Sequence, residues 1–258
     1  LAKAARVPFD ETIGIDFFLG SMPKDFDTHR HVRDLIARPD SVFNATHTAI
    51  VTLAEAFGTP RVVTTNFDDH LRVAAQSQAL PISDRWVGPA LPLGDNFIGL
   101  VHLHGSVDRD PSELVLTDRD FGRAYLTEAW AARFLRRMFE AFTVLFVGYS
   151  HDDPIMRYLA LGLPSRTSRF ALTADPADEK WRHLGIVPVP YPAPDNDHSA
   201  VPALLNAWNH RVRMGRQEHH DKMREIVESG PTLSPVDEDY LRASLAEVDG
   251  AREFTRLA

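Results

Sequence analysis

Three stretches of the sequence place residues that can do chemistry directly after an apolar run. The runs end in Asn66 and Asp68, in His104 and Gly105, and in Gly148, Tyr149 and Ser150. An amide and a carboxylate can hold the hydroxyl and amide groups of a ligand, and an imidazole titrates near neutral pH and can accept a proton. Glycine allows a ligand to approach the backbone closely. These residue types indicate a ligand site with proton transfer.

Each stretch also has a structural interpretation. A single Asn after a strand usually closes a turn, a single His in a strand is more often a core residue, and "GYS" alone indicates only a turn. His102 is interpreted as structural or supporting, although side chains alternate along a strand and it should point the same way as His104. The functional interpretation is favoured because all three stretches follow strands of one series.

The elements that position these residues follow from the apolar runs. Five strands are predicted, at residues 61–67, 97–105, 143–150, 168–174 and 185–191. Their apolar residues are successive rather than alternating, which is typical of parallel strands buried on both faces. Helical patterns lie between several strands, at residues 128–142, 152–162 and 176–185. We therefore predict an α/β fold with a Rossmann-like doubly wound parallel sheet and a small helical subdomain.

Ligands of such sheets bind outside the carboxyl ends of the strands, so the three polar strand ends should converge on one crevice. The helix that follows "GYSHDDP" would present free N–H groups to a phosphate there. Two earlier helices are expected, one over residues 28–38 that Pro39 ends and one from an Asn44 N-cap to a stop at Gly58. A helix over residues 203–215 should close the domain.

The domain organisation is predicted as residues 1–215 for a catalytic domain, with its core at 41–191, and 216–258 for a linker and the helical start of a larger C-terminal region. The polar tail after residue 228 carries only a thin apolar stripe. We expect this tail to bury no core of its own.

Composition excludes several classes of protein. The chain has no cysteine, which rules out disulfides, a thiolate nucleophile and a Cys-ligated zinc. A net charge of −8 argues against direct nucleic-acid binding by this domain, and the arginines at 133, 136 and 137 are interpreted as a solvated helix face. No apolar run approaches the length of a membrane span and no signal peptide is evident, so a cytoplasmic location without membrane contact is expected.

Three motifs together resemble the SIR2 (sirtuin) superfamily. They are "TTNFD" at 64–68, "LHG" at 103–105 and "VGYS" at 147–150, and "FNATHTAI" is similar to the helix entry of that family. The departures are a missing four-cysteine zinc ribbon, Thr65 in place of the usual Gln, and no glycine-rich "GAGxS" loop before residue 41. With these departures the chain resembles the SIR2-like domains of bacterial anti-phage defence proteins. Those domains are similar to NAD+ glycohydrolases and stand at the N-terminus of long chains, some with a STAND-type NTPase.

The resemblance implies NAD+ as substrate, no metal, and a role for each motif residue. Asn66 and His104 would be catalytic, with Asn66 holding a ribose hydroxyl and positioning water while His104 accepts a proton. Asp68 would bind the nicotinamide carboxamide. The remaining NAD+-binding residues would be Thr64 and Thr65 near the ribose, and Gly148, Tyr149 and Ser150 along the pyrophosphate and adenosine.

The implied function is an NAD+ glycohydrolase that depletes NAD+ as the effector domain of a defence protein. Control by a homo-oligomer or by a C-terminal regulatory region of the same chain is expected. Two alternatives remain open at this point. One is a zinc-independent protein deacylase or ADP-ribosyltransferase, which needs a groove for an acceptor beside His104. The other is an inactive NAD+ or ADP-ribose sensor, which would bind NAD+ without releasing nicotinamide.

Overall fold

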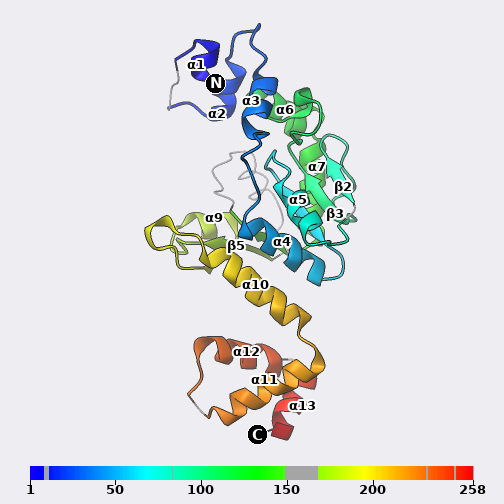
Figure 1. Ribbon diagram of the computed structural model, residues 1–258, viewed down its shortest axis with the longest axis vertical. Coiled ribbons are helices and arrows are strands. Elements are labelled where there is room, and N and C mark those ends of the chain that lie inside the picture. The colour runs from blue at the N-terminus through cyan, green and yellow to red at the C-terminus, as the bar shows by residue number, and fades with distance from the viewer. Residues whose placement is uncertain (9–11, 83, 149–167, 231, 247, 258) are drawn as a thin grey trace. The chain divides into compact units, whose positions relative to one another are not determined.

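A computed structural model of the chain describes residues 1–8, 12–82, 84–148, 168–230, 232–246 and 248–257 (Figure 1). Its strands are β1 (Arg61–Thr64), β2 (Arg85–Val87), β3 (Gly99–His102), β4 (Val144–Phe146), β5 (Arg169–Thr173) and β6 (Val187–Pro190). Its α-helices are α1 (Ala2–Ala5), α2 (Ile15–Gly20), α3 (Thr28–Ile36), α4 (Ala45–Ala56), α5 (His70–Ser77), α6 (Asp118–Gly122), α7 (Trp130–Ala141), α9 (Lys180–Leu184), α10 (Ala200–Arg213), α11 (Arg216–Glu228), α12 (Pro235–Leu245) and α13 (Val248–Leu257). Short turns of 3₁₀-helix are η1 (Pro111–Glu113) and η3 (Pro194–Asn196), and η2 (Arg123–Thr127) is a turn of π-helix.

The named strands all pair in parallel, which confirms the predicted α/β class. They form two sheets of three strands, in the orders β1-β3-β2 and β4-β5-β6. Strand β2 was not predicted, because it has only three residues and its tryptophan, Trp86, is exposed. The predicted strands at 61–67 and 97–105 end earlier, at Thr64 and His102.

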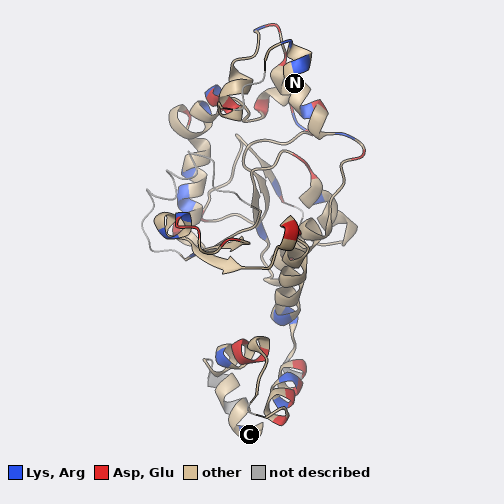
Figure 2. Ribbon diagram, turned by 90° about the vertical axis from the view of Figure 1, so that its left-hand side faces the viewer, with Lys and Arg blue, Asp and Glu red and all other residues tan. Residues whose placement is uncertain are grey.

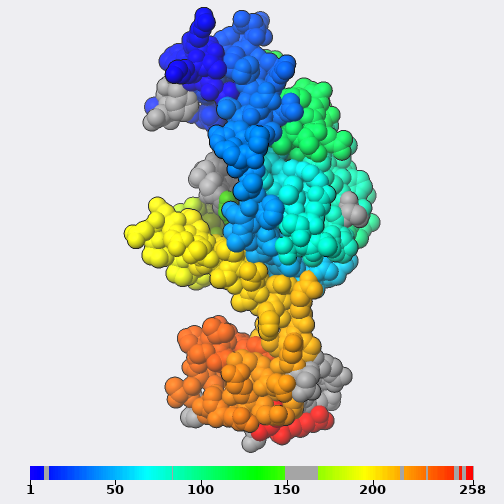
Figure 3. Space-filling view, viewed as in Figure 1, coloured from blue at the N-terminus to red at the C-terminus, as the bar shows by residue number. Residues whose placement is uncertain are grey.

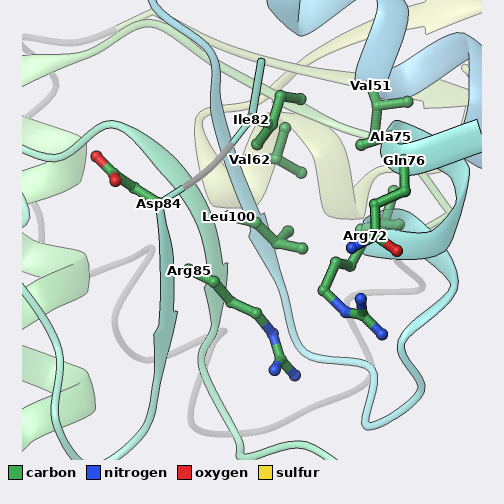
Figure 4. A pocket seen from close by; sticks show the side chains of 10 residues that line it. Val51, Val62, Arg72, Ala75, Gln76, Ile82, Asp84, Arg85 and Leu100 are labelled. Atoms are coloured by element: carbon green, nitrogen blue, oxygen red, sulfur yellow. The ribbon is translucent and has the colours of Figure 1, made fainter. Parts of the chain in front are cut away.

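Helices cover both faces of the first sheet, as the doubly wound prediction requires. Val62 and Leu100 pack with α4 and α5, whereas Val63 and Val101 pack with α7. Successive side chains on a strand point to opposite faces, so a run that is apolar at successive positions serves both helical layers. Figure 4 shows Val62 and Leu100 facing side chains of α4 and α5.

The second sheet shares a core with α7. Phe146 of β4 lies against the α7 cluster and also against a cluster that holds Ala171, Trp181 and Leu184. One side chain therefore joins the packing of α7 to that of β5 and α9. This continuity sets the end of β4, where Gly148 follows.

The predicted helical subdomain lies over the segment that follows β3. Phe18 and Leu19 of α2 and Val32 of α3 share a buried cluster with Leu114 and Leu116. Figure 3 shows the N-terminal helices, in blue, against the segment of α6, in green. The N-terminal helices thus fix the chain between β3 and α7.

The start of α4 agrees with its prediction. The Asn44 side chain accepts hydrogen bonds from the backbone N–H groups of Thr46 and His47, at 3.0 and 3.2 Å. Such a cap satisfies N–H groups that have no partner within the helix. Gly58, the predicted stop, lies two residues beyond Ala56 with a φ of 76°.

The chain divides into two compact units, at residues 1–209 and 210–258. In the second unit Met223 and Ile226 of α11 are buried with Tyr240 of α12. The tail after residue 228 was expected to bury no core of its own. In the structure it contributes Tyr240 to a buried cluster that it shares with α11. Lys222 of α11 pairs with Glu225 of the same helix and with Asp237 of α12, and acidic and basic residues are interspersed along the helices near the C-terminus (Figure 2). None of the described helices is both long and apolar enough to cross a bilayer.

Candidate active site

The loop after β1 is fastened to the loop after β3. The Thr64 carbonyl accepts a hydrogen bond from the Leu103 N–H at 2.8 Å, and the Phe67 carbonyl accepts one from the Val107 N–H at 2.9 Å. The Thr64 hydroxyl accepts the Asn66 N–H at 3.0 Å and so closes a tight turn. The two loops that carry the candidate residues therefore form one structure.

The turn presents Asn66 to solvent while its neighbours are covered. Asn66 is exposed, Thr65 and Asp68 are half-buried, and Thr64 is buried. The Thr64 hydroxyl is engaged with the backbone of Asn66. Its evident role is to shape the turn that displays the Asn66 amide.

Asp68 is partly engaged in the start of α5. One carboxylate oxygen accepts the His70 N–H at 3.0 Å, as is common before the first turn of a helix. The same oxygen lies 4.0 Å from Nδ1 of His70, and the Asp68 side chain keeps 23% of its exposure. Its other oxygen leaves Asp68 able to accept a hydrogen bond from a ligand.

His104 lies in an aromatic box beneath α6 and η2. Its side chain is 4% exposed, and its Nε2 lies 2.6 Å from the Tyr125 hydroxyl. The imidazole meets Phe121 edge-on, with 5.3 Å between ring centroids, and Tyr125 edge-on at 5.8 Å. Burial lowers the pKa of His104 to about 4, so the ring is neutral at pH 7 and has a lone pair to accept a proton.

His102 is also buried but has different neighbours. No side chain within the described part of the chain bonds either ring nitrogen. Burial first, and then the positive charge of Arg85, lowers the pKa of His102 to about 4, although the neighbouring backbone of Asn66 acts to raise it. Strand β3 ends at His102, so the alternation that predicted a common direction for both histidines does not extend to His104. The interpretation of His102 as a buried supporting residue agrees with its zero exposure.

A network of charges lies beside His102. Arg85 binds both carboxylate oxygens of Asp108, at 2.6 and 2.7 Å, and the Ser106 hydroxyl at 2.7 Å. Its guanidinium is also 3.5 Å from Asp69, which pairs in turn with Arg72. The hydrogen bond from Arg85 holds the pKa of the Asp108 carboxyl far below its usual range. The network joins the start of α5 to the loops that follow β1 and β3.

A second anchor fixes α6. The Asp120 carboxylate accepts hydrogen bonds from the hydroxyl and the N–H of Thr117, at 2.7 and 3.0 Å, and lies 2.8 Å from Nε2 of His29 on α3. Burial acts to raise the pKa of Asp120, but the hydrogen bonds from His29 and Thr117 outweigh it and lower the pKa to about 2. The hydrogen bond to Asp120 raises the pKa of His29. The helical subdomain thus holds α6, and with it the wall of the His104 box.

Of the glycine motif after β4, only Gly148 falls within the described residues; Tyr149 and Ser150 lie outside them. Gly148 has a φ of 66°, and a Cβ added there would meet nothing within 4 Å among the described residues. Gly105 has a φ of 94°, and a Cβ there would come within 3.0 Å of the Glu113 carbonyl oxygen. Gly105 therefore serves close packing of the chain.

Two hollows lie beside this region, and neither is lined by Asn66 or His104. A cavity of about 150 Å³ opens between α5 and the first sheet, with the guanidinium groups of Arg72 and Arg85 at its polar side (Figure 4). A wider hollow of about 410 Å³ lies between α3 and η1, lined by His29, Arg30 and Arg33 among others. The candidate residues are thus grouped at the joined loops and not within either hollow.

Sequence reasoning missed the side chains that support these residues. Tyr125 and Phe121 form the His104 box, and Arg85 with Asp108 forms the charge network. A signal existed for the first pair, because two aromatic residues four apart on a helix share one face. Arg85 had no comparable signal, because strand β2, which it begins, was itself not predicted.

Comparison with known proteins bears on the same region. The sequence profile described as "SIR2-like domain" matches residues 60–212, which contain β1 to β6 and most of α10. The chain is also similar to the uncharacterized protein y4cA of Sinorhizobium fredii, with 30% identity over 227 residues. That alignment covers 79% of this chain and 19% of y4cA, so the chain spans about a fifth of the length of that relative.

Proposed function

The chain belongs to the SIR2-like domain family, and on that premise we propose that it hydrolyses NAD+ to nicotinamide and ADP-ribose. The observation that carries the proposal is the joining of the two motif loops, which sets the exposed Asn66 amide and the neutral His104 imidazole on adjacent segments. An amide that orients ribose and water, with an imidazole that accepts a proton, is what cleavage of this glycosidic bond requires.

The proposed reaction breaks the bond between nicotinamide and ribose C1′. Nicotinamide leaves as a neutral molecule, positive charge develops on the ribose, and a water oxygen bonds to C1′. Asn66 holds a ribose hydroxyl and orients that water, and His104 takes its proton. Asp68 binds the nicotinamide carboxamide through the oxygen that α5 leaves available.

The remaining motif residues would serve binding. Thr65 lies beside the ribose, and Thr64 acts through the turn that it forms with Asn66. The positive φ of Gly148, which glycine adopts readily, supports an approach of the pyrophosphate to the backbone there. Tyr149 and Ser150 would continue this side toward the adenosine.

The proposal extends to the biological role. The motif forms resemble those of bacterial anti-phage effectors, so we assign this domain to NAD+ depletion in a defence protein. An enzyme of that kind has to be restrained until it is needed. Restraint by assembly of several copies, or by a C-terminal region of the same chain, follows from this role.

The test is nicotinamide release from NAD+ by wild-type protein, His104→Ala and Asn66→Ala, each checked for folding by its melting temperature. His183→Ala is the matched control, because His183 is exposed and lies outside the motif loops. We expect release by wild type and by the control, and a loss of about 10²- to 10⁴-fold in the two site variants. Binding of NAD+ without release would favour a sensor. Deacylation of an acyl-lysine peptide would favour the deacylase alternative.

A further inference from the structure

Among the described residues, Tyr125 is the side chain that hydrogen-bonds His104. Its hydroxyl lies 2.6 Å from Nε2 of His104, and both side chains are 4% exposed. A hydrogen bond that water cannot reach is strong, and its loss leaves a buried polar atom without a partner. The imidazole is therefore held in one place by Tyr125.

The surrounding rings restrict the imidazole further. Phe121 and Tyr125 stack with centroids 6.0 Å apart and an angle of 18° between their planes. His104 stands nearly perpendicular to both, at 80° to Phe121 and 75° to Tyr125. The rings of Phe121 and Tyr125 leave few rotamers open to the imidazole of His104. Its orientation is fixed before any ligand arrives.

The backbone that carries Tyr125 is unusual. Residues 123–127 form a turn of π-helix, a conformation that is rare and concentrated at functional sites. The wider turn starts directly after α6, whose first turn is fixed by Thr117, Asp120 and His29. The place of Tyr125 is therefore set by a segment outside the three motifs.

We propose that Tyr125 is a positioning residue for His104: its oxygen accepts Nε2–H and leaves Nδ1 as the nitrogen that takes the proton. This inference rests on the proposed role of His104 as the base. A neutral imidazole has one N–H and one lone pair, so engaging Nε2–H fixes the lone pair on Nδ1. The proton of the attacking water passes to Nδ1 while its oxygen bonds to ribose C1′. Tyr125 stays neutral throughout and continues to accept Nε2–H from the imidazolium.

The first test compares Tyr125→Phe with Tyr191→Phe. The control is matched, because Tyr191 also bonds a histidine, His198, at 2.8 Å, but does so near the surface and away from the motif loops. Tyr125→Phe keeps the ring and removes only the hydroxyl. We expect kcat for nicotinamide release to fall on the order of 10- to 100-fold, with KM changed by less than about twofold. Tyr191→Phe should match wild type.

The second test reads the tautomer directly and needs no activity. Nitrogen-15 NMR of histidine-labelled protein should show His104 in wild type and Tyr191→Phe as a single Nε2–H tautomer. Tyr125→Phe should show a mixture of both tautomers. His104→Gln identifies the resonance, and equal melting curves establish that the variants are folded.

The outcomes separate the two proposals. If wild type releases no nicotinamide, the proposed function fails, while the tautomer of His104 still tests Tyr125. An unchanged tautomer in Tyr125→Phe overturns the positioning role. Faster release by Tyr125→Phe also overturns it, because the tyrosine would then restrain His104 instead of preparing it.

Discussion

Two histidines two residues apart occupy unlike surroundings, one among charges and one among aromatic rings. His102 lies beside Arg85, Asp69 and Asp108, and its ring nitrogens bond no side chain within the described residues. His104 is enclosed by rings and bonded to Tyr125. Both have a pKa of about 4, although a positive charge contributes only to that of His102. A lowered pKa therefore does not distinguish a base from a supporting residue.

Geometry makes the distinction that the pKa cannot make. A base needs a fixed tautomer and a fixed orientation, which come from a partner on its second nitrogen. His104 has a side-chain partner, the Tyr125 hydroxyl, whereas His102 lies beside the backbone of Asn66 and bonds no side chain among the described residues. This difference supports the proposed role of His104 in proton transfer, and the charge network joins the loops after β1 and β3 to α5.

The largest predicted effect concerns acid stability, and it tests whether both regions bury a neutral histidine. The folded pKa of about 4 lies below the ordinary 6.5 for both residues, so between these values the unfolded chain binds more protons. The free energy of unfolding should then fall as pH drops from 6.5 to 4, by up to about 1.4 kcal/mol per pH unit for each histidine. Urea unfolding at several pH values measures this slope.

Single variants apportion that slope. His102→Gln and His104→Gln should each remove the contribution of one histidine to the pH dependence of the free energy of unfolding. The exposed control His183→Gln should leave that pH dependence unchanged. If only one of the two variants lowered the slope of the free energy of unfolding against pH, the two histidines would not both be buried in the neutral form. Such a result would mean that the other histidine is protonated in the folded chain.

Much of the fold followed from the sequence because burial leaves a local pattern. Runs that are apolar at successive positions predicted five of the six named strands, and Asn44 predicted the start of α4. Strand β2 was not predicted, because its three residues are too few to show a pattern of apolar residues. The division of the strands into two sheets was also not predicted, because the residues of a strand do not determine which other strand it pairs with.

The sequence predicted those residues of the candidate site that belong to short motifs. Asn66 and His104 stand on loops that the structure joins, and the sequence predicted that the carboxyl ends of these two strands would lie close together. Their supports were not predictable, because the partners are distant in sequence. Tyr125 follows His104 by 21 residues, and Arg85 precedes Asp108 by 23. Such pairs depend on tertiary packing rather than on any local pattern.

The second prediction concerns Arg85 and separates the two histidines. Arg85→Met removes the cation that Asp69 and Asp108 share, so we expect a loss of about 2 kcal/mol in the free energy of unfolding. Arg137→Met is the control, because Arg137 and Asp95 form an exposed pair, and it should cost less than about 1 kcal/mol.

The same variant should change the titration of His102 alone. Removing the positive charge of Arg85 removes one cause of its low pKa, so the pKa of His102 should rise. His104 owes its pKa to burial and should titrate as before. NMR titration of both rings in folded Arg85→Met measures the difference, and equal shifts would show that the two regions are not separate.

The smallest prediction concerns His29, which anchors α6 to α3. The pKa of His29 is raised by Asp120, so the ion pair contributes stability below pH 6.5 and loses it as pH rises through the raised value. His29→Gln should therefore cost about 1 kcal/mol at pH 6 and less at pH 9, while His183→Gln costs little at either pH. Because Tyr125 follows α6 directly, loosening this anchor should also shift the NMR signals of His104 and leave those of His102 in place. A shift at His102 instead would mean that the helical subdomain acts on the charge network and not on the aromatic box.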